Sequence, residues 1–348
     1  MRIAQVAPLF ESVPPKYYGG TERVVSYLTE ELVRQGHHVT LFASGDSVTK
    51  AHLVAGCRRS LRLDKHCVDQ IAHHVLMMEH VVQRASDFDV IHFHVDYMHY
   101  PLSRRHRTAH VTTLHGRLDI ADLVPLYQEF RDMPVVSISN SQRDPLPGAN
   151  WQATVYHGLP GDLYEFNPQP GKYLAFLGRI SPEKRVDRAI EIAKQVQIPL
   201  KIAAKVDDVN RDYFESAIAP MLHNPLIEYV GEIGDGEKQE FLGCAIGLLF
   251  PIDWSEPFGL VMIEALACGT PVIAYRRGSV PEVIDDERTG FIVEELGDAV
   301  AAVLRLPEIS RQRCRETFER RFSVSRMADE YLLIYDWLLD ARAAVKAG

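Results

Sequence analysis

The stretch GLLFPIDWSEPFGLVMIEALACGTPVIAY, residues 247–275, indicates the fold of this 348-residue chain. Its first part, Gly247–Pro251, is an apolar run of strand length, and Phe258–Cys268 has the length and composition of a buried helix. A second strand-length run, Pro271–Tyr275, follows after Gly269-Thr270. A strand, a helix and another strand in succession predict a parallel β–α–β unit with helices covering the sheet.

The same alternation continues towards both ends of the chain, which predicts a doubly wound α/β architecture. Further strands are expected at Arg2–Pro8, His38–Ala43, Asp89–Phe93, Val111–Leu114, Pro134–Ser139, Tyr173–Gly178, Leu200–Lys205 and Ile227–Gly231, and helices at Thr21–Gln35, Lys184–Gln197 and Val324–Lys346. The pattern stops at the proline- and glycine-rich segment Gly158–Lys172, which we interpret as a linker. We therefore expect domains at 1–165 and 171–326, with a final helix, 327–348, that crosses back to the first.

Composition excludes several classes of protein. The formal net charge is −9, from 38 basic and 47 acidic residues, which disfavours sequence-independent nucleic-acid binding. The five cysteines show no CxxC spacing, so neither a disulfide framework nor a zinc site is predicted. No apolar run reaches the ~18–20 residues of a membrane span, and the N-terminus lacks a secretory pattern, so we expect a cytoplasmic protein.

Four groups of residues are candidates for chemistry, because ligands of doubly wound sheets bind at the carboxyl ends of strands. The first is Tyr18-Gly19-Gly20-Thr21, where two glycines open a helix whose N-terminus suits a phosphate; the alternative is a turn with Thr21 as N-cap.

The second is Gly178–Arg185, which we interpret as a helix start capped by Ser181. Cations in a first helical turn oppose the helix dipole, so Lys184 and Arg185 suggest an anion there.

The third candidate is Glu264, the only charged residue between Phe258 and Tyr275. A carboxylate in an apolar helix needs strong partners. A vicinal diol such as a ribose would supply two hydrogen-bond donors, whereas the alternative is a structural ion pair with a lysine or arginine.

The fourth candidate is a group of histidines at strand ends in the first half, where 13 of the 15 histidines precede residue 116. We expect His92 to be structural, and His94 and His115 to donate hydrogen bonds to a sugar hydroxyl. His92 and His94 fall on the same face of a strand, as metal ligands can, but no further ligand spacing completes a set, so no metal site is predicted.

These motifs resemble the retaining glycosyltransferases of family four. The resemblance rests on Gly19-Gly20, His115-Gly116, Gly178-Arg179 with Lys184, and Glu256 with Glu264 leading into Gly269-Thr270-Pro271. It implies the GT-B fold, in which two Rossmann-like domains face each other across a cleft. It also implies a nucleotide-sugar co-substrate, UDP-glucose favoured, with no cofactor and no metal.

Residue roles are implied by the same resemblance. Arg179, Lys184, Glu256 and His115 would be catalytic, with the two cations on the diphosphate and the other two residues on the donor sugar. The donor would also be bound by Gly19, Gly20, Phe258, Gly259, Leu260, Glu264, Lys205 and Ile233.

The sequence says less about the acceptor substrate than about the donor. We expect Glu11, Lys16, His94 and Tyr97 on its side of the site, and a small-molecule or lipid-linked acceptor. The basic clusters at 58–62 and 104–107 could contact a membrane surface or an acidic acceptor, although such clusters are more often solvated. A sugar-nucleotide epimerase, a pyridoxal-phosphate phosphorylase and a non-catalytic binding protein remain as alternatives.

Overall fold

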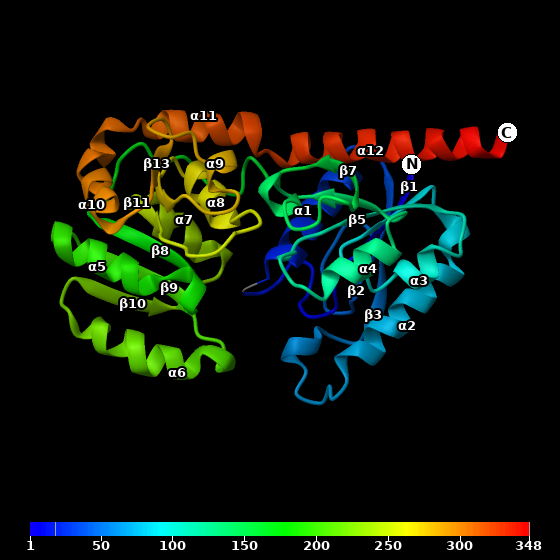
Figure 1. The fold of residues 1–348 in the computed structure, drawn as a ribbon, viewed down its shortest axis with the longest axis horizontal. Helices are drawn as coiled ribbons and strands as arrows, with labels where there is room; N and C mark the ends of the chain where they lie inside the picture. The colour runs from blue at the N-terminus through cyan, green and yellow to red at the C-terminus, as the bar shows by residue number, and fades with distance from the viewer. Residues whose placement is uncertain (18, 348) are drawn as a thin grey trace. The chain divides into compact units, whose positions relative to one another are not determined.

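The computed structural model describes residues 1–17 and 19–347 and divides into two compact units (Figure 1). Unit 1 is Met1–Pro160 with Val324–Gly348, and unit 2 is Gly161–Ser323. Tyr18, part of the predicted glycine turn, and Gly348, the end of the predicted final helix, lie outside the described residues.

Unit 1 contains a seven-stranded parallel sheet in the order β3-β2-β1-β4-β5-β6-β7. Its strands are β1 Arg2–Val6, β2 His38–Ser44, β3 His52–Cys57, β4 Val90–Phe93, β5 Ala109–Thr113, β6 Pro134–Ser137 and β7 Asn150–Thr154. The edge strands β3 and β7 were not predicted. Both are only partly buried, so neither carries the continuous apolar run that marks an interior parallel strand.

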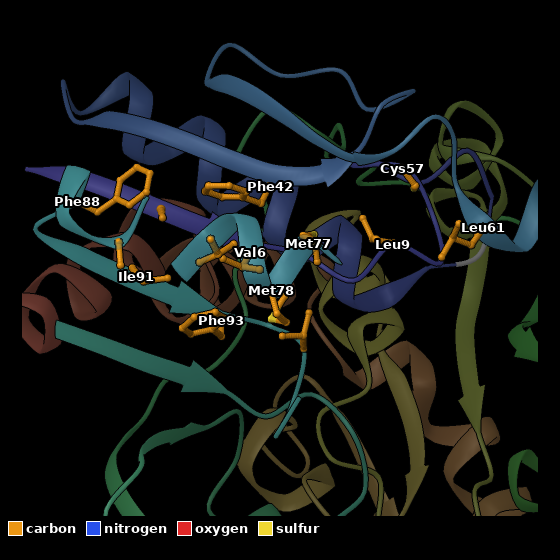
Figure 2. Packing of buried hydrophobic residues seen from close by; sticks show 14 residues of the cluster. Val6, Leu9, Phe42, Cys57, Leu61, Met77, Met78, Phe88, Ile91 and Phe93 are labelled. Atoms are coloured by element: carbon orange, nitrogen blue, oxygen red, sulfur yellow. The ribbon is translucent and has the colours of Figure 1, made fainter. Parts of the chain in front are cut away.

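Unit 1 has helices α1 Gly20–Arg34, α2 Gln70–Gln83, α3 Tyr100–Ser103, α4 Leu123–Glu129 and α12 Val324–Ala347. Helix α12 packs against α1 and β5, so the end of the chain belongs to the first sheet (Figure 1). Figure 2 shows one core of this unit, where α2 contributes Met77 and Met78 to a cluster with Val6, Phe42 and Phe93 from the sheet. This packing fixes the strands whose carboxyl ends carry the candidate residues.

Unit 2 contains a six-stranded parallel sheet in the order β10-β9-β8-β11-β12-β13. Its strands are β8 Tyr173–Arg179, β9 Leu200–Lys205, β10 Ile227–Gly231, β11 Ala245–Phe250, β12 Val272–Tyr275 and β13 Gly290–Val293. Its helices are α5 Val186–Val196, α6 Arg211–Tyr213, α7 Asp235–Gly243, α8 Leu260–Ala267, α9 Val280–Val283, α10 Leu296–Arg305 and α11 Arg311–Arg321. The predicted strand–helix–strand stretch is β11, α8 and β12.

The segment predicted as a linker is mostly part of unit 2. Residues beyond Pro160 pack onto that unit, where the Asn167 side chain donates to the Gly243 carbonyl at 3.0 Å. The Asn167 carbonyl in turn accepts a 2.7 Å hydrogen bond from the Arg311 guanidinium. Proline and glycine here mark an irregular but anchored segment rather than a free linker.

None of the helices in the described part of the chain is long and apolar enough to cross a membrane.

Candidate functional site

Two cations end neighbouring strands in unit 2. Arg179 is the last residue of β8 and is the register partner of Lys205, the last residue of β9. Both approach Asp207: the Lys205 ammonium lies 2.5 Å and the Arg179 guanidinium 3.6 Å from its carboxylate. Arg179 also lies 3.5 Å from Glu183. The parallel sheet therefore places two positive side chains together at its carboxyl edge.

Lys184 and Glu256 form an ion pair, although they are 72 positions apart in the chain. Only 12% of the Lys184 side chain and 11% of the Glu256 side chain are exposed. The Lys184 ammonium also lies 5.0 Å from the ring centre of Trp254, whose indole nitrogen donates to Glu256 at 3.0 Å. An aromatic face and a carboxylate thus hold this ammonium in a largely desolvated position, where its electrostatic interactions are screened less than in water.

The local structure that presents Lys184 differs from the prediction. Pro182–Lys184 is a single 3-10 turn, and α5 begins at Val186, so neither Lys184 nor Arg185 lies in the first turn of that helix. Ser181 makes no capping hydrogen bond. Arg185 has a left-handed backbone (φ 54°) and binds Asp187 at 2.7 Å and Asp253 at 3.1 Å. The anion inferred from Arg185 is therefore supplied by the protein, and the helix-dipole argument for this position was wrong.

The N-terminus of α8 lies between Glu256 and Glu264 in the chain. Gly259 precedes it with φ +80°, and a Cβ there would approach the Met262 methyl carbon to 2.8 Å and the Phe250 ring to 3.0 Å. Phe258 is buried against Phe322, with ring centres 6.2 Å apart. Leu260 begins the helix, and no side chain caps it. The Met262 N–H of the first turn donates to the Gly259 carbonyl at 3.0 Å, and the positive end of the helix dipole lies at this terminus.

Glu264 is buried, as predicted, and the structure provides it with partners. Lys238 of α7 donates to its Oε1 at 2.8 Å, and the Tyr164 hydroxyl lies 3.4 Å from the same oxygen. Within the described residues no hydrogen bond reaches Oε2. The structural ion pair is therefore present, and one carboxylate oxygen is left for a ligand.

Ile233 follows the carboxyl end of β10 and is partly buried. The strand carries a bulge at Tyr229–Gly231, and Gly231 has φ +82°. The Tyr229 hydroxyl donates to the Ala204 carbonyl at 2.8 Å, which ties this end of β10 to β9.

Gly19 and Gly20 belong to unit 1, at the start of α1. Gly20 is the first helical residue and Gly19 occupies the cap position, so Thr21 is not the N-cap. A Cβ on Gly19 would lie 2.7 Å from the Cβ of Pro15. The need for glycine at position 19 is thereby explained by packing.

His94 and His115, the two histidines predicted to donate to a sugar, differ in burial and in hydrogen bonding. His94 is buried, with Nδ1 2.9 Å from Nε2 of His115 and Nε2 2.8 Å from the Gln5 amide oxygen. Both of its nitrogens are engaged, so the prediction that His94 serves a substrate was wrong. His115 is partly exposed and stacks on His157 at 5.3 Å. Burial lowers the pKa of His115 to about 3, so this ring is neutral at physiological pH.

His92 is structural, as predicted: its nitrogens lie 2.7 Å from the hydroxyls of Tyr335 and Thr113. Of the expected acceptor-side residues, Glu11 is buried and paired with Arg62, which removes it from an exposed pocket wall. Lys16 and Tyr97 are exposed.

The two basic clusters are partly neutralised by the protein. Arg104 binds Glu129 and Asp132, both at 2.6 Å, and Arg62 binds Glu11. In the described residues no group of three or more His, Cys, Asp or Glu side chains could hold a metal ion.

Sequence reasoning missed three partners in unit 2: Asp207, Trp254 and Lys238. Asp207 follows β9 by two residues, and Trp254 stands two before Glu256, so proximity to strand ends and to a predicted site residue could have indicated both. Lys238 lies 26 positions before Glu264, and only the packing of α7 against α8 brings them together.

Comparison with known proteins identifies the family. The model "Glycosyl transferases group 1" matches residues 165–321, and "Glycosyltransferase Family 4" matches residues 18–138. The chain belongs to the family four, group 1 glycosyltransferases. Each of the two matches lies largely within one of the two units.

Curated relatives of this glycosyltransferase are similar over part of their length. A D-inositol 3-phosphate glycosyltransferase of Mycolicibacterium smegmatis is 27% identical over 249 residues, which are 63% of this chain and 53% of that protein. An uncharacterized 41.2 kDa protein in the cps region of Klebsiella pneumoniae is 30% identical over 168 residues, 47% of this chain and 45% of that protein. The chain thus spans about half the length of these relatives.

Solved structures show the same GT-B fold. Sucrose-phosphate synthase of Thermosynechococcus elongatus has a TM-score of 0.81 at 18% identity, covering 98% of this chain and 100% of that one. AviGT4, a glycosyltransferase of avilamycin A biosynthesis, has a TM-score of 0.75 at 22% identity over 98% of both chains. Anabaena Alr3699/HepE, solved with UDP-glucose, has a TM-score of 0.72 at 15% identity over 97% of this chain and 99% of that one. The predicted GT-B fold is confirmed.

Proposed function

We propose that this glycosyltransferase moves a hexose from a nucleotide-sugar, UDP-glucose favoured, to an acceptor hydroxyl with retention of configuration and without metal. The observation that carries the proposal is the set of cations at the carboxyl edge of unit 2: Arg179, Lys184 and Lys205. All three lie beside carboxylates: Arg179 at 3.5–3.6 Å from Glu183 and Asp207, Lys205 at 2.5 Å from Asp207, and Lys184 in an ion pair with Glu256. Such a set suits a diphosphate, which can compete with those carboxylates for the same donors.

Lys184 and Glu256 would act by exchanging partners. When a diphosphate draws the Lys184 ammonium, the Glu256 carboxylate is released from its ion pair but keeps the Trp254 indole as a donor. It can then accept hydrogen bonds from hydroxyls of the donor sugar. Arg179 and Lys184 would stabilise the negative charge that grows on the leaving phosphate, the kind of electrostatic assistance that dominates many enzymes.

Nucleoside recognition would fall to Glu264 and to the end of β10. The Oε2 of Glu264 would accept a ribose hydroxyl while Lys238 holds Oε1, and the backbone near Ile233 would receive the base. On the acceptor side, the leaving phosphate itself would take the proton of the attacking hydroxyl, so no protein base is invoked.

Nucleotide-sugar binding and turnover test the proposal directly. A thermal-shift screen with UDP, GDP and ADP and their hexose derivatives should show the largest stabilisation with one nucleotide, since ligand at 100 times Kd adds about 2.7 kcal/mol. Nucleotide release with an acceptor, and proton NMR of the product anomer with and without chelator, then test transfer, retention and metal independence. Stabilisation without transfer would favour the binding protein, and conversion of the donor to its epimer would favour the epimerase.

We further propose that the acceptor is lipid-linked and is met at an anionic membrane surface. The supporting observation is an apolar face that continues from the preceding loop onto α2, where Val68, Ile71, Val75 and Leu76 are 98%, 69%, 61% and 55% exposed. Three exposed cations, Arg58, Arg59 and Lys65, lie in the segment just before it. Apolar side chains flanked by cations are typical of interfacial binding.

Co-sedimentation with vesicles of phosphatidylcholine, with or without phosphatidylglycerol, tests this surface. The double variant Ile71→Asp/Val75→Asp should lose binding to the anionic vesicles. Val209→Asp, at a position 86% exposed in unit 2, is the matched control and should bind as the wild type does. Equal binding by both variants, or none by the wild type, would leave a soluble acceptor as the better proposal.

A further inference from the structure

We propose that the loop after β12, Arg277–Ser279, positions the Glu256 carboxylate, and that Ser279 is the positioning residue through which this loop acts. The proposal rests on the proposed function, because a fixed carboxylate is needed there to contact the donor sugar. Ser279 makes no contact with substrate and acts on the main chain around Glu256. Every contact that carries the proposal lies within unit 2.

The segment that carries Glu256, Trp254–Phe258, is an irregular connection between β11 and α8. The Glu256 N–H donates to the Trp254 carbonyl at 2.9 Å. Pro257 has a φ fixed near ~−65° by its ring and offers no N–H. An irregular segment of this kind keeps one conformation when neighbouring elements supply partners for its carbonyl groups.

Ser279 holds two carbonyls of this segment, one on each side of Pro257. The Ser279 N–H donates to the Glu256 carbonyl at 3.0 Å, and the Ser279 hydroxyl donates to the Phe258 carbonyl at 2.8 Å. The direction of both hydrogen bonds is fixed, because a carbonyl oxygen only accepts. Ser279 is fully buried, so water does not replace either bond.

The two residues before Ser279 bring the loop against the same segment. Gly278 has φ +53°, and a Cβ there would collide with the backbone nitrogen and the carbonyl oxygen of Glu256. Only a residue without a side chain can approach that main chain so closely. The Arg277 guanidinium lies 3.6 Å from the carboxylate of Asp253, which Arg188 also contacts at 2.9 Å. The loop is therefore tied to the segment through both main chain and side chains.

The fixed main chain determines where the Glu256 carboxylate lies, because it sets the direction of the Cα–Cβ bond. Lys184 and the Trp254 indole both donate to Oε2. From the residues that the structure describes, no hydrogen bond reaches Oε1, so Oε1 is the oxygen that would accept from a sugar hydroxyl. Groups of an active site must be held within about 0.5 Å of their productive place, so loss of the Ser279 hydrogen bonds should displace this oxygen enough to matter.

NMR of protein labelled with nitrogen-15 at tryptophan tests the positioning without any substrate. The chain has three tryptophans, and the indole of Trp254 donates to Glu256 at 3.0 Å, so its signal reports the carboxylate. Ser279→Ala should move this signal towards the lower proton chemical shift of a weaker hydrogen bond. Ser279→Cys, which keeps a weak donor, should move it in the same direction and less far.

Thr270→Val is the matched control for the NMR measurement. The Thr270 hydroxyl is also fully buried and donates to the Leu242 carbonyl at 2.7 Å, but it lies at the amino end of β12. Its removal should leave the Trp254 signal in place. An unmoved Trp254 signal in both Ser279 variants, or an equal movement in Thr270→Val, would overturn the proposal.

Kinetics test whether Ser279 acts through Glu256. Ser279→Ala should lower kcat/KM for the nucleotide-sugar about tenfold in the otherwise wild-type enzyme, but less than about twofold in Glu256→Gln, where the carboxylate is already absent. Calorimetry should show unchanged binding of the nucleotide alone, and Thr270→Val should keep wild-type kcat/KM. Equal losses in the two backgrounds would overturn the proposal. Failure to turn over any nucleotide-sugar would instead overturn the proposed function, and the Trp254 signal would still decide whether Ser279 positions Glu256.

Discussion

At the scale of single residues, Lys184 is the cation of the proposed diphosphate site that is most closely surrounded by other side chains. Its ammonium is nearly enclosed by Glu256 and Trp254, and an isolated charge in such a place would be costly. In the proposed function, the Glu256 carboxylate is the partner that a phosphate of the donor would replace. Removal of either member leaves the other uncompensated, so the two residues must be tested by neutral replacements of similar shape.

Lys184→Met should lower kcat/KM by about 10²-fold, roughly 2.7 kcal/mol, because the variant lacks the preorganised positive charge that would stabilise the leaving phosphate. Steady-state kinetics with the nucleotide-sugar found in the screen provide the measurement. Lys194→Met is the matched control, since Lys194 is exposed on α5 and binds Glu191 at 3.0 Å. Wild-type turnover in Lys184→Met would remove this lysine from the site.

Glu264→Gln should weaken nucleotide binding, measured by calorimetry, by about tenfold, because a neutral amide accepts a weaker hydrogen bond than a carboxylate. The same change removes the nearer of the two carboxylates beside the Lys238 ammonium and leaves only Asp235, at 3.6 Å, so the melting temperature should fall as well. Glu264→Gln/Lys238→Met separates the two effects: it should recover stability but not affinity. Recovery of both would show that Glu264 is only a structural partner of Lys238.

At the scale of elements, the turn before α8 determines where the helix N-terminus points. Gly259 adopts φ +80°, and its surroundings leave no room for a side chain. Both constraints act at the residue that connects the Glu256 loop to the helix.

Gly259→Ala should therefore destabilise the protein by about 1–3 kcal/mol, from strain in the left-handed region and contact with Met262 and Phe250. Nucleotide affinity should fall with it, because the first N–H groups of α8 move. Denaturant unfolding measures the first effect and calorimetry the second. Gly297→Ala in α10 is the control: a Cβ there meets nothing within 4 Å, and stability should be unchanged or slightly higher. Equal stability of the two variants would contradict this account of the turn.

At the scale of the whole molecule, the histidines are unequally distributed between the two units. Unit 1 buries a set of histidines whose pKa values are lowered by burial: His74, His92, His94, His99, His110, His115 and His157. Residues 161–323 contain a single histidine, His223.

Unit 1 should lose stability first as the pH falls. An unfolded histidine titrates near ~6.5, so below that pH the unfolded chain binds more protons than the folded one and the free energy of unfolding decreases. The loss continues towards the folded pKa values, about 4 for His110 and about 3 for His115. Hydrogen exchange measured by mass spectrometry between pH 7 and 5 should show loss of protection in unit 1 before unit 2.

Two variants check that histidines cause this dependence. His110→Leu should flatten the slope of stability against pH even if it changes stability at pH 7, whereas His66→Asn, at an exposed position, should leave the slope unchanged. Simultaneous loss of protection in both units would contradict the attribution of this pH dependence to the buried histidines of unit 1.

The sequence by itself determined the parallel α/β architecture of both units and indicated the strand ends at which the candidate residues lie. Interior parallel strands are covered on both faces, so they appear as largely apolar runs such as Leu200–Lys205, which is β9 residue for residue. Because parallel strands all end at one edge of the sheet, the sequence also places Arg179 and Lys205 beside each other. Edge strands β3, β7 and β13 were missed: β3 and β7 are partly exposed and lack that run, and β13 is only four residues long.

Only the tertiary structure decided which side chains are free and which already have partners. Arg185 is held by Asp187 and Asp253, Glu264 by Lys238, and Glu11 by Arg62. Apart from Arg185 with Asp187, these pairs join positions 26 to 68 apart. Apolar periodicity reports burial along one element, but the partner of a buried charge depends on which elements pack together.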